Sequence, residues 1–249
     1  MKNIIQDFFA PIKNTVVEPK EYTKIQNLKK WCNIVSFAIN QSIYVIDYSA
    51  KEFLYVSPHP LFLCGYTAQE VQQMGYLFYE KVVSEEDLQM LSEINKMGWT
   101  QFYSAATVDR NYCISYDFFL HHKNGSQTLV SHKLAVLELA KDNNIWLAIC
   151  FVGISPNKTS GNVVFTQNNT CKYFTYDFTA KKIISHLPPQ LTKREKEVLN
   201  LSMQGYNEKQ ISEKMNVSVL TVKKHRRNLQ NKLGVSNMAN AVSKFNLSF

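Results

Sequence analysis

Three long basic side chains recur at helical spacing near the end of the chain. Lys223 and Arg227 are four residues apart and Lys224 and Arg227 are three apart, so on a helix these side chains share one surface. Lysine and arginine arranged in this way can enter the major groove of DNA together, where guanine O6 and N7 accept hydrogen bonds. This chemistry requires that the surrounding residues form a helix and hold it in place.

Short helices with recognisable N-terminal caps are predicted around this surface. Thr192 is followed three residues later by Glu195, and Asn207 is followed at the same spacing by Gln210. Both pairs are typical of a capping box, which satisfies the free amides at a helix start. Ser218 is a third candidate cap. The predicted helices span residues 193–204, 208–215 and 219–233.

A small apolar core is expected between these three helices. Val222, Leu229 and Leu233 recur on one stripe of the third helix, the pattern of a face that packs against other elements. The residues expected to receive them on the first two helices are Val198, Leu201, Ile211 and Met215. The three basic side chains then point away from this core.

The positive charge of the chain is concentrated in its last quarter. Residues 187–249 hold 11 Lys and Arg against 4 Asp and Glu, a net charge of +7, whereas residues 1–186 hold 17 against 16, a net charge of +1. A basic helix face on its own is most often only solvated. The uneven distribution instead favours a nucleic-acid-binding module.

Four sequence runs in this region resemble the LuxR-type helix-turn-helix family. They are L-T-x-R-E-x-E-V-L at 191–199, G-x-N-E-K-Q-I at 205–211, S-x-x-T-V-K-x-H at 218–225 and K-L-G-V at 232–235. The resemblance implies an all-α domain of four helices, in which the third helix reads the major groove and the fourth often helps two copies to pair. The fourth helix would run from about Asn237 to Phe245, with Ser236 as its cap.

The same resemblance places the base-reading positions of the family at Lys223, Lys224 and Arg227. The candidates for contacts to the DNA backbone are Thr192, Arg194, Asn207, Lys209, Ser218, Thr221, Arg226 and Lys232. Two residues depart from the family pattern. Val219 stands where a polar or acidic residue is usual, and Ser212 replaces a usual alanine where the second helix packs closely.

Upstream of this domain the pattern changes from helical to strand-like. Residues 42–56 contain two short β-rich runs around a polar turn, which predicts a hairpin. Three longer runs at 112–122, 128–139 and 145–154 are separated by turn residues that include Asn124-Gly125, and they predict an antiparallel meander. A helix is expected near residues 84–97.

This order of strands and helices resembles a PAS domain over about residues 42–155. The runs that carry the resemblance are V-I-D-Y (45–48), L-Y-V-S-P (54–58), G-Y-T-x-x-E-V (65–71), E-E-D-L (85–88) and K-N-G-S (123–126). It implies an α+β fold in which a five-stranded antiparallel sheet cups several helices. The concave side of such a sheet either holds a small ligand or is filled by core side chains.

We predict no specific cofactor for the sensor, and a small-molecule ligand of unknown identity is the alternative to a filled core. The run that binds flavin in related photoreceptors does not occur here. A haem-type sensor stays open as a further alternative, because one histidine can serve as axial ligand. The histidines in or near the sensor are His59, His121, His122 and His132, and ordinary core or surface roles are favoured for them.

Two further segments flank the sensor. In residues 19–41, the residues Ile25, Leu28, Trp31, Cys32 and Val35 recur at helical spacing and predict an amphipathic helix, which packs on its own sheet or pairs with a second copy. An extra hairpin is predicted after residue 161, around Asn168-Asn169-Thr170, with a third strand near KKIIS. The predicted domains are a helical flank (1–41), the PAS-like sensor (42–155), the hairpin or coupling segment (156–186) and the helix-turn-helix domain (187–249).

The sequence contains no catalytic constellation, so we predict a regulator and no enzyme. Five widely spaced cysteines indicate neither a zinc site nor a disulfide framework, and the absence of a leader or membrane segment favours the cytoplasm. We expect a transcription regulator that binds double-stranded DNA as a homodimer, with RNA polymerase as a further candidate partner. The alternatives are a sigma-like or polymerase-associated factor and a haem-type sensor with a DNA-binding tail.

Overall fold

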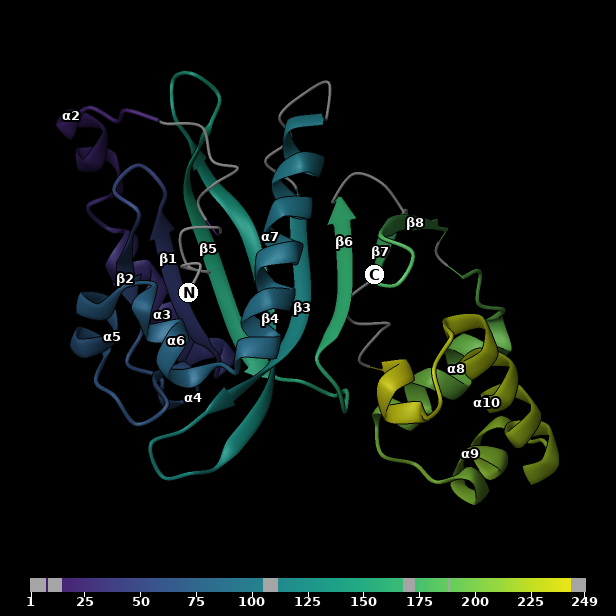
Figure 1. Ribbon diagram of the computed structural model, residues 1–249. Helices are drawn as coiled ribbons and strands as arrows, with labels where there is room; N and C mark the ends of the chain where they lie inside the picture. The colour runs from purple at the N-terminus through teal and green to yellow at the C-terminus, as the bar shows by residue number, and fades with distance from the viewer. Residues whose placement is uncertain (1–7, 9–14, 105–111, 168–172, 188, 243–249) are drawn as a thin grey trace. The chain divides into compact units, whose positions relative to one another are not determined.

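The computed structural model describes residues 8, 15–104, 112–167, 173–187 and 189–242, and the chain divides into two compact units (Figure 1). The first unit comprises residues 1–170 and 174–184, and the second comprises residues 171–173 and 185–249. The helices are α2 (Pro19–Tyr22), η1 (Thr23–Ile25), α3 (Leu28–Ile39), α4 (Pro60–Leu63), α5 (Ala68–Met74), α6 (Leu77–Val82), α7 (Glu85–Ser104), α8 (Lys193–Met203), α9 (Glu208–Met215) and α10 (Val219–Leu233). The strands are β1 (Ser42–Asp47), β2 (Glu52–Val56), β3 (Tyr112–His121), β4 (Gln127–Leu139), β5 (Ile145–Ile154), β6 (Gly161–Gln167), β7 (Tyr173–Asp177) and β8 (Lys182–His186).

The strands form one sheet in the order β2-β1-β5-β4-β3-β6-β7-β8. The predicted hairpin and meander are confirmed, and neighbouring strands from β2 to β6 in this order pair in antiparallel fashion. The prediction of a five-stranded sheet is wrong, because the part of the chain that the structure describes contains eight strands. In a five-stranded sheet β3 would leave one row of backbone groups unpaired; here β6 covers that row, with Ile114 opposite Phe165.

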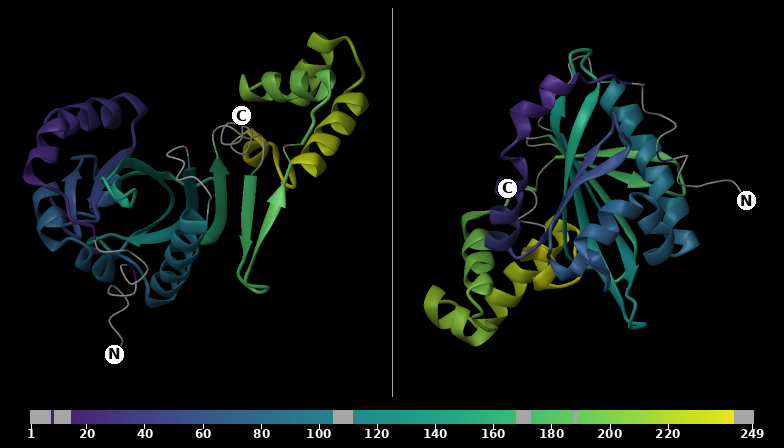
Figure 2. Two further views of the ribbon diagram at one scale, coloured as in Figure 1. Left: turned by 90° about the horizontal axis from the view of Figure 1, so that it is seen from above. Right: turned by 90° about the vertical axis from the view of Figure 1, so that its left-hand side faces the viewer.

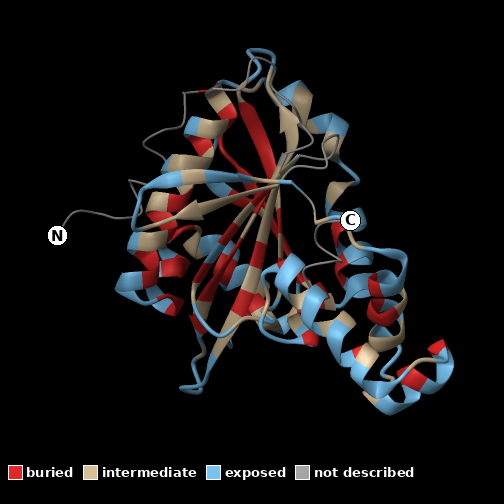
Figure 3. Cartoon of the chain, turned by 90° about the vertical axis from the view of Figure 1, so that its right-hand side faces the viewer, coloured by how far each residue is buried: buried red, intermediate tan, exposed pale blue. Residues whose placement is uncertain are grey.

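Helices α4 to α7 cover one face of the sheet, and aromatic side chains fill the space between them (Figure 2). The fully buried rings include Tyr44, Phe53, Phe62, Phe78 and Phe118. Figure 3 shows how buried residues follow the central strands. Of the two states predicted for the concave face, the described residues therefore show the filled one around these rings.

Helix α7 is longer than the predicted 84–97, since it continues to Ser104. The prediction ended before Gly98, a residue that weakens a helix interior. The helix continues because Trp99 and Phe102 beyond it are buried in the aromatic core. Packing of these two rings outweighs the local preference of the glycine.

Helix α3 lies on the opposite face of the sheet, where Cys32 packs with Ile43 and Trp146 (Figure 2). The predicted amphipathic helix is present, but in shorter pieces and with a different buried face. Trp31 is 60% exposed and Val35 is 38% exposed, so these two residues do not pack on the sheet. Pairing with a second copy, the other predicted alternative, stays a prediction. No described helix has the length and apolar character needed to cross a membrane.

Candidate nucleic-acid interface

Helices α8, α9 and α10 begin where the sequence caps predict. In the first capping box Thr192 N donates to Glu195 Oε2 over 2.8 Å, and Glu195 N donates to Thr192 Oγ1 over 3.3 Å. In the second, the Asn207 and Gln210 backbone amides each donate to the other side chain, over 2.9 and 3.0 Å. Ser218 accepts from Thr221 N over 3.1 Å. Local hydrogen bonds thus fix the start of each helix.

The small core of this unit holds α10 against α8 and α9. Val222 packs with Val198, Ile211 and Met215, as predicted. Leu229 and Leu233 instead pack with Leu199, which is fully buried and was not among the predicted core residues. The predicted contributor Leu201 is only partly buried at the edge of the first cluster.

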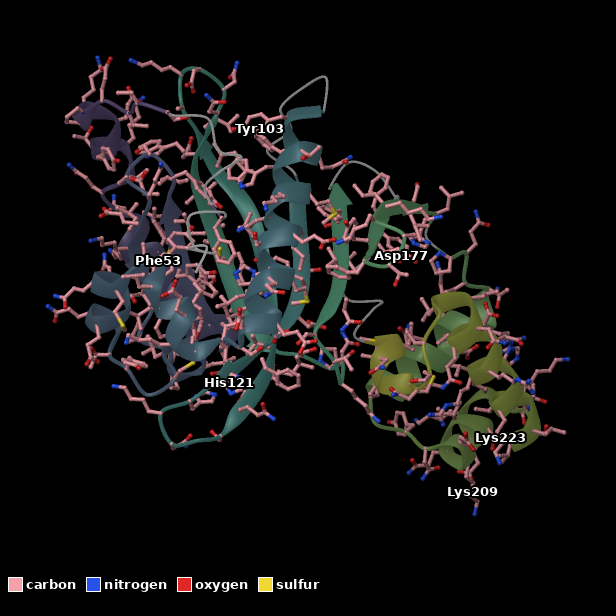
Figure 4. All side chains as sticks on the ribbon, in the orientation of Figure 1. Phe53, Tyr103, His121, Asp177, Lys209 and Lys223 are labelled. Carbon is pink, nitrogen blue, oxygen red and sulfur yellow. The ribbon has the colours of Figure 1, made fainter. Side chains whose placement is uncertain are left out.

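The basic surface lies on the opposite side of α10 from this core. Lys223, Lys224 and Arg227 are all exposed, so the structure brings the three predicted base-reading residues to one face. Lys223, labelled in Figure 4, lies 3.8 Å from Glu208 Oε2 through its Nζ. Lys224 and Arg227 have no ion-pair partner among the described residues.

Two of the predicted backbone-contact residues are held by internal carboxylates. Arg226 Nη1 lies 2.9 Å from Glu208 Oε1, and the side chain of Arg226 is only 25% exposed. Lys232 Nζ donates to Glu195 Oε2 over 2.7 Å and to Gln190 O over 3.1 Å. Burial raises the pKa of Glu195, but the hydrogen bonds from Lys232 and Thr192 outweigh it and hold the pKa below its usual value. Lys232 therefore ties the end of α10 to the start of α8.

The remaining backbone candidates fall into two groups. Polar side chains at helix starts serve as caps or contact a cap, while the basic ones extend from the surface. Thr192, Asn207 and Ser218 belong to the first group together with Thr221, whose hydroxyl lies 2.9 Å from that of Ser218. Arg194 pairs with Glu197 over 2.8 Å, and Lys209, labelled in Figure 4, is exposed on α9.

A fourth helical segment follows α10 at residues 238–242. Its cap is Asn237, whose Oδ1 accepts from Asn240 N over 2.8 Å, so the prediction of Ser236 as the cap is wrong by one residue. Met238 and Ala241 are buried against Leu229 and Leu233. The rest of the predicted helix, residues 243–245, lies outside the described residues.

The two residues that depart from the family pattern have different positions. Ser212 is buried and its hydroxyl donates to Lys209 O over 2.7 Å, which leaves room for the helices to pack closely. Val219 is 37% exposed at the first turn of α10, and the next residue, Leu220, is 76% exposed. Sequence reasoning did not select Leu220, although its position four residues before Lys224 placed it on the basic face.

The first unit contains a buried polar cluster within its aromatic core. His132 Nε2 lies 2.6 Å from Tyr44 Oη, which also contacts the hydroxyl of Tyr79. His132 Nδ1 is buried without a hydrogen-bond partner in the described structure, and burial lowers the pKa of His132 to about 3. Tyr116 packs on the ring with centroids 4.7 Å apart.

The other three histidines named for the haem alternative do not join this cluster. His59 caps α4, His122 Nε2 lies 3.0 Å from Thr128 Oγ1, and His121 is exposed. An apolar cavity of about 50 Å³ lies elsewhere in the core, beside Tyr48 and Trp99. The rings of Tyr44, Tyr116 and Phe118 lie with centroids 5.7, 4.7 and 5.9 Å from that of His132, so the filled arrangement around His132 does not fit a haem.

Comparison with known proteins identifies the second unit. Residues 189–245 match the family of bacterial regulatory proteins of the luxR type, and this part of the chain is a luxR-family DNA-binding domain. No curated protein sequence matches the chain.

Solved structures resemble the chain only weakly. A Vibrio cholerae VqmA dimer without target DNA, described among LuxR-type receptors, is 14% identical with a TM-score of 0.32, and the match covers 92% of this chain and 86% of that one. The N-terminal domain of a diguanylate cyclase with a PAS/PAC sensor from Marinobacter aquaeolei is 15% identical with a TM-score of 0.34, over 46% of this chain and 94% of that one. At these scores the neighbours carry no conclusion about fold, ligand, partner or assembly.

Proposed function

We propose that this chain is a sequence-specific transcription regulator, in which the PAS-like first unit modulates how the luxR-family domain binds double-stranded DNA. The single observation that carries this proposal is the division of α10 into two faces. Val222, Leu229 and Leu233 are buried on one side, while Lys224 and Arg227 are exposed on the other without an internal carboxylate partner among the described residues. A helix fixed in this way presents cations whose hydrogen-bonding capacity is free for a polyanion.

The basic side chains have separate roles in this proposal. Lys224 and Arg227 contact guanine O6 and N7, and Lys223 joins them after release of its 3.8 Å contact with Glu208. Lys209 and Arg194 contact phosphates. Arg226 and Lys232 act mainly within the domain, because Glu208 and Glu195 already hold them.

Two copies of the chain would bind one DNA site as a homodimer. A two-fold dimer places two recognition helices about one helical turn of DNA apart, so a change in the pairing of the copies changes the affinity for DNA. The sensor needs no direct contact with DNA to act in this way. It needs only to alter the linkage between the copies.

The segment between the sensor and the DNA-binding domain offers a route for such a change. Glu93 on α7 accepts a hydrogen bond from Tyr176 Oη over 2.8 Å and pairs with Lys181. Phe178 also packs against the core of the first unit. Strand β7 and the turn before β8 are therefore fastened to α7, and β8 leads along the chain to α8.

The strand-rich first unit supports a regulator over a sigma-like factor. A sigma-like factor would need a helical promoter-melting region upstream of its DNA-binding helices. The described residues of 42–155 instead form five strands of the sheet and the helices on its concave face.

Selection of duplexes from a random DNA library by the full chain tests the proposal. We expect a defined sequence to be enriched, and Lys224→Ala or Arg227→Ala to weaken its binding by about 1–3 kcal/mol and to relax the preference at one position. Lys30→Ala, which removes an exposed lysine of α3, is the charge-matched control and should bind normally. Equal losses on all DNA sequences would argue against base reading.

A further inference from the structure

Leu220 is the apolar centre of an otherwise polar and basic helix face. It precedes Lys223 by three residues, Lys224 by four and Arg227 by seven, so the four side chains share one surface of α10. Its side chain is 76% exposed, and the residues on the opposite face form the core of the domain. Folding therefore does not account for a leucine at this position.

Exposure alone would decide nothing, because single exposed apolar residues are common on protein surfaces. The position of Leu220 distinguishes it from Leu187, which is 73% exposed in the same unit but lies outside the helices. Leu220 lies among three cations, and Val219 extends the apolar area towards Lys223. Any polyanion drawn to these cations must bring its surface against both apolar side chains.

The floor of the major groove offers one strongly apolar group to such a side chain. Thymine carries a C5 methyl group there, whereas cytosine, guanine and adenine present polar edges. Phosphate and sugar groups offer a leucine no comparable partner. The chemistry of the surface therefore selects a base and not the DNA backbone.

We propose that Leu220 is a specificity-determining residue that packs on the C5 methyl group of a thymine. This inference rests on the proposed function, since it assumes that α10 enters the major groove. Four helical residues rise about 6 Å, so the thymine lies within about two base pairs of the base contacted by Lys224. Val219 widens the apolar contact at the edge nearer Lys223.

The experiment replaces thymine by deoxyuridine, which removes only the methyl group. Each thymine of the duplex selected by the full chain is replaced in turn, and the dissociation constant is measured for the wild type, Leu220→Ala and Leu187→Ala. At one position in each half-site we expect the wild type to lose about fourfold in affinity, the effect of one buried methyl group. The control variant Leu187→Ala should lose as much affinity as the wild type when the same thymine is replaced by deoxyuridine.

Leu220→Ala should bind the thymine duplex about as weakly as the wild type binds the deoxyuridine duplex, and it should not respond to removal of the methyl group. This loss of response is a coupling between one side chain and one methyl group, which a structural effect of the substitution would not produce. Circular dichroism of the variant should be unchanged, because the side chain is exposed.

The two ways of failing are distinguishable. Specific binding in which wild type and Leu220→Ala respond equally to every deoxyuridine would overturn the role of Leu220 and leave the proposed function in place. Absence of any preferred sequence for the wild type would overturn both. Weaker self-association of Leu220→Ala with unchanged response to the methyl group would assign the residue to a protein contact and also overturn the inference.

Discussion

Helices α3 and α10 each pack one face against a core and expose the other face. The exposed face of α3 is largely apolar, whereas that of α10 is basic. On α3 the outward residues include Trp31, which is 60% exposed, and Phe37, which is 89% exposed. On α10 they include Lys224 and Arg227. Core packing does not constrain the outward face of either helix, so these two faces differ in composition although each helix packs its other face against a core.

The two units also gain their stability in different ways. The first unit relies on a sheet with long-range pairing and a core rich in aromatic rings, with His132 and Tyr44 buried inside it. The second has only small apolar clusters and adds to them helix caps and an ion pair between its helices. The following predictions sharpen this contrast.

The largest effect is expected in the aromatic core. Phe118 is fully buried between the sheet and the helices, and Phe118→Ala should lower the free energy of unfolding of the first unit by about 3–5 kcal/mol. Phe37→Ala, which removes an exposed ring, is the matched control and should have almost no effect. Thermal unfolding monitored by near-ultraviolet circular dichroism measures both; equal losses would show that the core is not packed as described.

A pH dependence is expected from His132. Its pKa lies at about 3 in the folded protein because burial excludes the charged form, whereas the unfolded chain takes up a proton near pH 6.5. Stability is therefore fully present above that pH and falls as the pH drops towards 3. Between pH 7 and pH 5 the loss should be about 2 kcal/mol.

The variant His132→Phe isolates this effect. Urea unfolding at pH 7 and at pH 5 should show that the variant lacks the additional loss of about 2 kcal/mol, whatever its stability at pH 7. His121→Phe is the control. Because His121 is exposed, this substitution should leave the pH dependence of stability unchanged. The same slope in wild type and His132→Phe would place the titration elsewhere.

A smaller effect is expected from the tie between Lys232 and Glu195. Lys232→Met leaves the Glu195 carboxylate, only 4% exposed, without its cation. Charged hydrogen bonds are worth up to about 3 kcal/mol, and partial exposure of the lysine reduces this to about 1–2 kcal/mol. Unfolding of the wild type and the variant in urea, followed by the helical signal, measures the difference. An unchanged midpoint would mean that solvent replaces the lysine without loss.

The smallest effect is expected from a helix cap. Asn207→Ala removes the acceptor for Gln210 N at the start of α9 and should cost about 1 kcal/mol. Asn207→Asp retains an acceptor and should restore most of the stability. If both variants unfold at the same denaturant concentration, the capping box does not contribute as described.

The elements that sequence reasoning predicted correctly depend on nearby residues. Thr192 with Glu195 and Asn207 with Gln210 act over three positions, so the bounds of α8, α9 and α10 were predicted within one residue. The Asn124-Gly125 turn likewise predicted the pairing of β3 with β4. These local patterns predict the structure correctly because no contact with distant residues overrides the local hydrogen bonds.

The features that sequence reasoning missed depend on residues that are distant in the chain. The contact of Lys232 with Glu195 joins positions separated by 37 residues. The sequence predicted a strand at β6 but did not show that this strand pairs with β3. The outward position of Trp31 follows from the way in which α3 packs on the sheet through Cys32. Periodicity predicted a helix there, but it could not show which of its apolar residues would be covered.

The most direct test of base reading by α10 compares the full chain on its selected duplex and on a scrambled duplex of the same composition, at one salt concentration. We expect the selected duplex to bind at least about 10³-fold more tightly, as in specific protein–DNA complexes. Arg227→Ala should reduce this ratio more than it reduces binding to the scrambled duplex. Equal affinity of the wild type for the two duplexes would contradict the assignment of α10 as a recognition helix.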